Sequence, residues 1–162
     1  MTPPRTLALR ERPGDWFFVC AFSFFFLSSW LSDIVPGLGI PIVPDSPNPL
    51  VQGVWLYAKD ADPFLIANPY NLRISTLISA FVFGSFYPFL VYAFVTGANW
   101  IRIPALMYVS AMVYGMINFL WAEFMGPTPP TALAWFFAWN LPYLIVPLLL
   151  ALRMHRVEPF SS

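Results

Sequence analysis

The stretch "ISTLISAFVFGSFYPFLVYAFVT", residues 74–96, decides the fold, because it lies between Arg73 and Arg102 and contains no charged side chain. A helix needs about 17 to 25 predominantly apolar residues to cross the hydrocarbon core of a bilayer. The stretch has that length. We therefore predict a membrane-spanning helix over residues 74–96.

Three further apolar stretches stand out when the charged residues are used as boundaries. They cover residues 16–32, 103–122 and 131–152. The first could be a secretory signal peptide, since basic residues precede it. It is longer than the usual apolar region of about 7 to 15 residues, however, and no small-residue cleavage site precedes Asp33. We interpret it as a helix, which gives four crossings.

The composition agrees with a membrane protein. Hydrophobic residues make up 59% of the chain and charged residues 10%, against about 25% charged in soluble domains. We predict an all-α integral membrane protein: a four-helix bundle forming a single domain over residues 1–162. Acidic and basic residues balance, so no strong field would attract nucleic acid. We find no spacing typical of metal ligands and expect no cofactor.

The distribution of basic residues predicts the orientation, because Lys and Arg accumulate in cytoplasmic flanks. They gather before the first helix, between the second and third, and after the fourth: Arg5, Arg10, Arg12, Arg102, Arg153 and Arg156. The opposite side has only Lys59 and Arg73. We expect both termini in the cytoplasm, with the membrane being the endoplasmic reticulum in a eukaryote or the cytoplasmic membrane in a bacterium.

A long non-cytoplasmic loop connects the first two helices, over residues 33–73. Its first half is too rich in proline and glycine for a continuous helix, whereas residues 50–59 have the apolar spacing of one short helix. The loop includes "WLYAKDADPF", residues 55–64, which concentrates charge. We expect Lys59 and Asp60 to stay in interfacial water and Asp62 to turn inward, with much lower solvent accessibility than Asp60.

Each predicted helix has a stripe of polar side chains on one face. The stripes are Ser29, Ser32 and Asp33; Ser75 and Ser79; Ser110, Tyr114 and Asn118; and Asn140 and Tyr143. Such residues often only hydrogen-bond neighbouring helices, for roughly 0.6 to 2 kcal/mol. Four stripes facing one interior favour a lined cavity. Our candidate ligand-binding residues are Asp33, Asp62, Ser29, Ser79, Tyr114, Asn118, Asn140 and Tyr143.

Asp33 and Asp62 are the most informative of these residues. A carboxylate at the end of a membrane helix either stays in interfacial water or finds a partner. If the loop folds back, Asp62 can be the partner of Asp33. The two carboxyl groups would then share one proton and attract a cationic amine. Glu123, at the end of the third helix, is most simply a charge in interfacial water.

The residues "LYAKDADPFL", "VYAFVTGANWIRIPALMY", "VYGMINFLWAE" and "LPYLIVPLLL" resemble segments of the EXPERA superfamily, whose members include the sigma-2 receptors and the emopamil-binding proteins. The resemblance runs from Asp15 to about Arg153. It implies a four-helix fold with cytoplasmic termini and a cavity for sterol-like or amine-bearing ligands. It also implies that Asp33 meets the ligand amine, that Asp62 supports it, and that Tyr143, Pro147 and Asn140 correspond to fourth-helix residues of the family.

Three positions depart from the sterol isomerases of this superfamily. Phe25, Ser29 and Ser79 stand where those isomerases have histidine and glutamates. Moving a double bond requires one group that delivers a proton and another that removes one. Neither phenylalanine nor serine does this at neutral pH. Isomerisation would therefore need Asp33, Asp62 and Glu123 as substitutes.

Three functions remain open at this point. The first is binding of a membrane lipid, a sterol-like molecule or another apolar amine in the cavity, oriented by Asp33 and Asp62. The second is an accessory or structural subunit of a larger membrane complex, and the third is a sterol or terpenoid double-bond isomerase. We expect a membrane lipid or sterol-like molecule as partner. A homodimer or a larger complex is compatible with the sequence.

Overall fold

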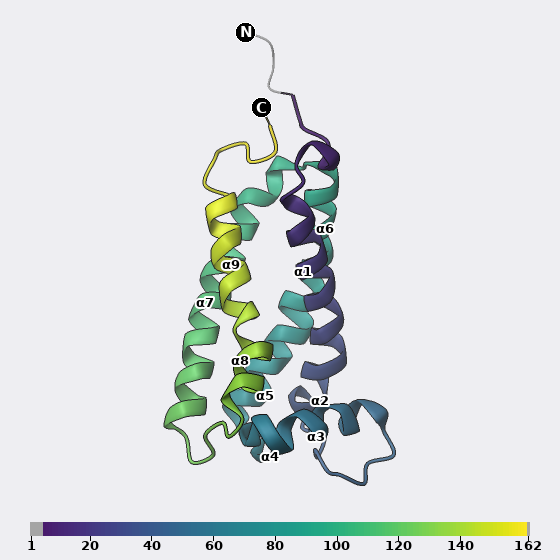
Figure 1. Ribbon diagram of the computed structural model, residues 1–162, viewed down its shortest axis with the longest axis vertical. Coiled ribbons are helices and arrows are strands. Elements are labelled where there is room, and N and C mark those ends of the chain that lie inside the picture. The colour runs from purple at the N-terminus through teal and green to yellow at the C-terminus, as the bar shows by residue number, and fades with distance from the viewer. Residues whose placement is uncertain (1–4, 162) are drawn as a thin grey trace.

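The computed structural model describes residues 5–161, and Figure 1 shows its helices as a long bundle with both chain ends at one end. Within these residues, four helices are long and apolar enough to cross a membrane. They cover Asp15–Gly37, Tyr70–Thr96, Asn99–Met125 and Leu133–Arg153. The predicted four-helix membrane bundle is thus confirmed.

Each crossing is built from shorter elements. The first contains α1 (Asp15–Ser28), the π-helical turn η2 (Ser29–Asp33) and α2 (Ile34–Gly37). The second contains α5 (Tyr70–Leu77), the π-helical η3 (Ile78–Phe83) and α6 (Gly84–Thr96). The third contains η4 (Asn99–Ile101) and α7 (Arg102–Met125), and the fourth α8 (Leu133–Asn140) and α9 (Pro142–Arg153). A short 3-10 helix, η1 (Leu9–Glu11), precedes them.

The first crossing extends further than the predicted residues 16–32. It continues through Pro36 to Gly37, although proline and glycine led us to expect loop. Pro36 falls in the first turn of α2, directly after a π-helical turn, where the loss of one backbone N–H is tolerated. Asp33 therefore lies inside a helical segment and not at its free end.

The loop between the first two crossings folds across the end of the bundle opposite the termini, as Figure 1 shows. It contains α3 (Pro49–Ala61), which confirms the short helix predicted over residues 50–59, and α4 (Pro63–Ala67), which was not predicted. Asp62 caps α4 by accepting a hydrogen bond from the Leu65 N–H at 3.3 Å. Proline after a capping aspartate is a helix-start signal.

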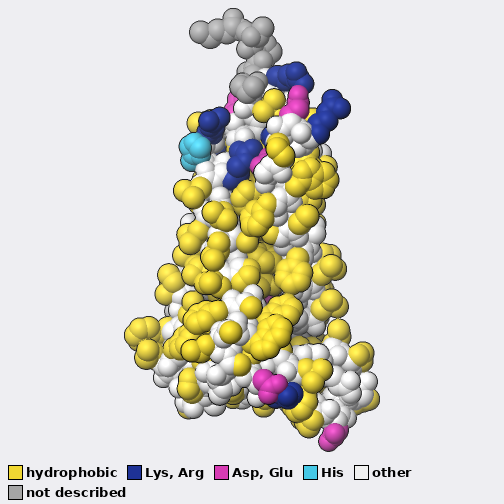
Figure 2. Space-filling view, in the orientation of Figure 1, with side chains coloured by type: hydrophobic (Ala, Val, Ile, Leu, Met, Phe, Trp, Pro, Cys, Tyr) yellow, Lys and Arg dark blue, Asp and Glu magenta, His cyan; other side chains and the backbone are white. Residues whose placement is uncertain are grey.

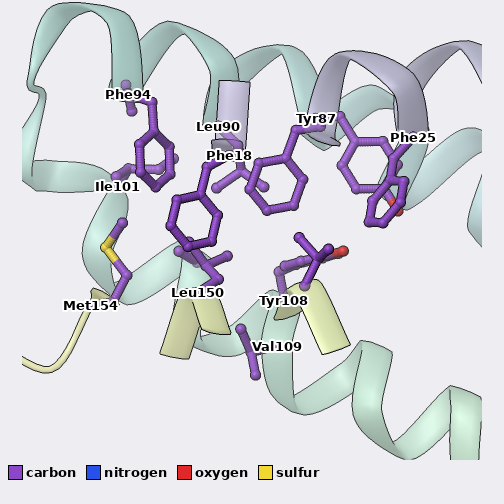
Figure 3. Packing of buried hydrophobic residues seen from close by; sticks show 14 of the residues in the cluster. Phe18, Phe25, Tyr87, Leu90, Phe94, Ile101, Tyr108, Val109, Leu150 and Met154 are labelled. Carbon is purple, nitrogen blue, oxygen red and sulfur yellow. The ribbon is translucent and has the colours of Figure 1, made fainter. Parts of the chain in front are cut away.

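Aromatic packing fills the half of the bundle near the termini. There α1 packs along α6, and α7 along α9. The ring of Phe18 stacks on that of Phe94, with centroids 4.9 Å apart, and Phe22 lies 5.9 Å from Tyr87. Figure 3 shows this cluster between the helices. Dense packing of this kind leaves no room for a ligand, so any cavity must lie in the other half.

The outer surface is apolar along the length of the bundle. Figure 2 shows hydrophobic side chains over the middle of the molecule and charged side chains at its two ends. Trp16, Trp100, Trp121 and Trp135 are all exposed. They lie near the ends of the crossings, where indole rings favour the interface between lipid and water. The protein is therefore an integral membrane protein.

A buried ion-pair network closes the end that carries the termini. Arg12 donates to Asp15, and Arg153 donates to both oxygens of that carboxylate, at 2.7 and 2.9 Å. The ring of Phe160 lies against both guanidinium groups, 4.6 Å from Arg12 and 5.2 Å from Arg153. These contacts join the start of α1 to the end of α9 and to the segment that follows it.

We predict that Asp15→Asn lowers the free energy of unfolding by about 3 to 5 kcal/mol, because it leaves the buried guanidinium group of Arg12 and the partly buried one of Arg153 without their carboxylate. Unfolding in a lipid–detergent mixture, followed by circular dichroism, measures the loss. Glu11→Gln is the matched control, since the exposed pair between Arg5 and Glu11 contributes about 0 to 1 kcal/mol. Equal stabilities for the two variants would contradict the prediction.

Candidate functional site

A cavity of about 560 Å³ occupies the half of the bundle opposite the termini. Residues from all four crossings and from the loop line it. Most of its walls are apolar. Its polar lining comprises Ser28, Ser32, Asp33, Tyr57, Asp62, Ser75, Thr76, Ser79, Tyr114, Asn118, Asn140 and Tyr143. A mostly apolar space with a few placed polar groups is typical of a small-molecule site.

The cavity is open to the outer surface, because several of its lining residues are exposed. Tyr114 lines it and is nevertheless 71% exposed. Asn118, Ser75 and Ile78 also combine cavity lining with exposure. Because these residues belong to α5, η3 and α7, which lie within the apolar length of the bundle, the opening faces the region that lipid covers.

Asp33 reaches the cavity from the end of the π-helical turn η2. It lies near Ser79, which belongs to the π-helical η3 of the next crossing. The two π-helical turns contact each other. Each inserts one extra residue per turn and shifts the side chains that follow, a feature frequent at functional sites. The juxtaposition of Asp33 and Ser79 depends on this irregularity.

Asp62 reaches the cavity from the loop, at the residue between α3 and α4. It is 2% exposed, whereas the Asp60 side chain is 61% exposed and pairs with Lys59. The predicted contrast in accessibility is confirmed. Burial raises the pKa of Asp62 to about 6, although backbone hydrogen bonds and the neighbouring Glu123 act in the opposite direction.

Glu123 was expected in interfacial water, and this interpretation is wrong. The residue is 0% exposed, although it lies near the end of α7. Its carboxyl group lies beside that of Asp62. The pairing that we expected between Asp33 and Asp62 is therefore replaced by a pairing of Asp62 with Glu123, while Asp33 faces Ser79.

Two neutral hydrogen bonds fix other polar side chains of the cavity. Asn140 donates to the hydroxyl of Tyr57 at 2.9 Å and thereby joins α8 to α3. Tyr143 bonds the hydroxyl of Ser28, and its ring stacks on Phe25 with centroids 4.2 Å apart. Burial and the nearby Asp62 carboxylate raise the pKa of Tyr57, so its hydroxyl stays protonated.

Ser29 is the one candidate that the structure places away from the cavity. It is fully buried and is not part of the lining, whereas its neighbour Ser28 is. Our assignment assumed uniform α-helical spacing, and the π-helical turn that begins at Ser29 changes which side chains share a face. Ser28, Tyr57 and Thr76 were missed; Tyr57 lies in the quoted loop stretch and was the easiest to find.

Tyr114 and Asn118 lie at the opening of the cavity. The side-chain amide of Asn118 donates to the backbone carbonyl of Tyr114 at 2.8 Å, within its own helix. Its side-chain oxygen stays available to a ligand or a water molecule. These two residues line the entrance, whereas Asp33, Asp62, Ser79, Asn140 and Tyr143 lie deeper, each less exposed than Tyr114.

A family model described as EXPERA (EXPanded EBP superfamily) matches residues 50–154 of the chain. Among curated proteins, none matches the chain. The matched residues begin in α3, include Asp62 and Glu123, and continue to the end of the fourth crossing. Asp33 and the first crossing precede them, so the placement of Asp33 at the cavity comes from the structure and not from this match.

We predict that Asp62→Asn removes a pH dependence of stability. Because the pKa of Asp62 is higher in the folded protein than in the unfolded chain, its carboxyl stabilises the fold below about pH 4 and this stabilisation is lost as the pH rises through about 6. The loss is on the order of 2 to 3 kcal/mol. Asparagine also caps helices, so α4 is retained.

Unfolding curves between pH 4 and pH 7 would measure this change. Asp60→Asn is the control, since its carboxylate is exposed and it should follow the wild type. If Asp62→Asn and the wild type lose stability in parallel over this range, the carboxyl of Asp62 is not buried as described.

Proposed function

Because the chain belongs to the EXPERA superfamily, we propose that it binds a membrane lipid, a sterol-like molecule or another apolar ligand that carries an amine. The observation that carries the proposal is the cavity of about 560 Å³, which opens within the apolar length of the bundle and contains Asp33 and Asp62. The ligand would enter from the bilayer.

The walls favour a large apolar body. Phe83, Met112, Met116, Phe119 and Trp139 line the cavity beside smaller aliphatic residues. Methionine and aromatic side chains adapt to flat or irregular ligands. A molecule already dissolved in the bilayer gains little hydrophobic free energy by moving into an apolar cavity. The polar groups of the cavity must therefore provide much of the affinity and the selectivity.

The absence of a basic partner for the cavity acids supports a cationic ligand group. Within residues 5–161, the ion pairs involve Asp15, Glu11 and Asp60, and neither Asp33 nor Asp62 pairs with Lys or Arg. A carboxylate in a largely dry site needs compensating charge. An ammonium group on the ligand supplies this charge together with a strong hydrogen bond. Asp33 would hold it, with Ser79 beside it.

Binding is better supported than isomerisation. Phe25 is buried and stacked on Tyr143, and Ser29 lies outside the cavity. At these positions the isomerases resembled by the sequence have groups that move protons. The neutral pairs of Tyr57 with Asn140 and of Ser28 with Tyr143 can instead orient a hydroxyl group on the ligand.

We also propose that both termini face the cytoplasm, on the basis of the basic residues near that end. We predict that a glycosylation acceptor inserted beside Asp45, in the exposed part of the long loop, is modified in microsomes, because this loop would face the lumen. An acceptor appended after the C-terminus should stay unmodified. The reverse pattern would overturn the orientation without affecting the fold.

We predict that Asp33→Asn weakens binding of 3β-aminocholest-5-ene about 10-fold to 100-fold, because a hydrogen bond to a charged group contributes roughly 1.5 to 3 kcal/mol. Binding of the radiolabelled amine to protein in phosphatidylcholine nanodiscs measures the change. The affinity for cholesterol, in which a hydroxyl group replaces the amine, should fall much less in Asp33→Asn.

The matched control for this experiment is Asp45→Asn, which removes an exposed carboxylate outside the cavity and should bind like the wild type. The proposal fails if the wild type binds neither sterol above protein-free nanodiscs. The role of Asp33 fails if Asp33→Asn binds the amine as tightly as the wild type does.

A further inference from the structure

Within residues 5–161, Glu123 has no conventional hydrogen-bond or ion-pair partner, although it is completely buried. Both oxygens of its carboxyl group lack a hydrogen-bond donor, and the side chain has no accessible surface. A buried carboxylate without donors is strongly disfavoured. The residue is also not among those that line the cavity.

The side chain that can pair with the buried carboxyl group of Glu123 is Asp62. Its carboxyl group lies beside that of Glu123. Two ionised carboxylates can only accept hydrogen bonds, so both charged forms would repel each other in this dry place. A single proton between them turns the repulsion into one O–H···O hydrogen bond. The pair then carries one negative charge in place of two.

No charged side chain near the pair compensates its negative charge within residues 5–161, so we assign this compensation to a proton. Tyr57 on α3 is the titratable side chain that faces both carboxyl groups, and its hydroxyl accepts from Asn140 on α8 at 2.9 Å. Lys59 lies nearby along α3, but its ammonium group binds Asp60 at the exposed surface. Asp33 belongs to the same cavity and faces Ser79. Within the described residues, no ammonium or guanidinium group pairs with Asp62 or Glu123.

We propose that Glu123 is a positioning residue for Asp62, that the two carboxyl groups share one proton, and that arrival of the ligand ammonium at the cavity acids releases it. The release step rests on the proposed function, whereas the shared proton does not. Asp62 is the member of the pair that faces the ligand, and Glu123 acts only through it.

The release step balances in charge and in atoms. The O–H bond between the two carboxyl groups breaks, the electron pair stays on the oxygen, and the proton passes to water. The pair gains one negative charge as the cavity gains the positive charge of the ammonium group. Ligand uptake would therefore be coupled to the loss of one proton, and the amine would bind more tightly as the pH rises, as long as the amine itself stays protonated.

The first test detects the shared proton without any ligand. Infrared difference spectra of the protein in phosphatidylcholine nanodiscs record the carbonyl stretch of a protonated carboxyl group, in an Asp33→Asn background that removes the other cavity acid. We expect Glu123→Gln and Asp62→Asn each to remove or shift this band, because both residues share the proton. Asp60→Asn should leave it unchanged.

The pairing is overturned if the band is the same in either Glu123→Gln or Asp62→Asn as in the parent protein. Both substitutions preserve size, and circular dichroism verifies that the helices remain. Should one variant fail to fold, the other still decides, since a proton held by two groups must respond to the loss of either.

The second test measures the release of the proton. Calorimetric titration of 3β-aminocholest-5-ene into nanodiscs, in two buffers of different ionisation enthalpy, counts the protons released per molecule bound. We expect about one proton for the wild type and none for Glu123→Gln, whose amide replaces the shared hydrogen bond without a removable proton. Equal release from both proteins would overturn the proposal. Absence of amine binding by the wild type would instead overturn the proposed function, and the infrared test would still stand.

Discussion

Burial of carboxyl groups inside a bundle surrounded by hydrocarbon is the constraint on which the rest of this structure depends. The two ends of the bundle differ in how the charge of these buried carboxyl groups is compensated. At the end with the termini, Asp15 receives hydrogen bonds from Arg12 and Arg153, so the charge is compensated within the chain. At the other end, Asp62 and Glu123 lie together, and within residues 5–161 no basic side chain pairs with them. The first arrangement is complete without a ligand, whereas the second leaves room for a proton or a cation.

The cavity exists because the helices are irregular at one level of the bundle. Two π-helical turns, η2 and η3, contact each other beside Asp33, and the fourth crossing is interrupted between α8 and α9, before Pro142. Proline and π-helical turns both change the direction or register of a helix and loosen its packing. The aromatic cluster around Phe22 and Tyr87 packs tightly in the other half. The bundle thus combines a closed half, in which aromatic packing holds the helices together, with a half that contains the cavity.

Much of the candidate site could be predicted from polar side chains at helical spacing, since residues such as Asp33, Ser79 and Tyr143 all line the cavity. The errors have physical causes. Ser29 was assigned by uniform α-helical spacing, which fails at a π-helical turn. Glu123 looked like an interfacial charge because it lies near the end of a crossing, whereas in the fold it is buried beside Asp62 of the loop. The side-chain directions at the π-helical turn and the contact of Glu123 with Asp62 cannot be predicted from a local sequence pattern.

The sequence by itself determined the membrane location, the four crossings and the family, because each depends on long apolar stretches and on local motifs such as "WIRIPA". It also indicated that Asp62 turns inward and Asp60 does not. Only the tertiary structure decided which carboxyl group stands beside Asp62, since Asp33 and Glu123 are both far from it in the chain. The choice depends on how α3 and α4 lie across the bundle. The contact between Asp62 and Glu123 joins residues that are far apart in the chain. It forms only when their elements pack together, so no local sequence pattern indicates it.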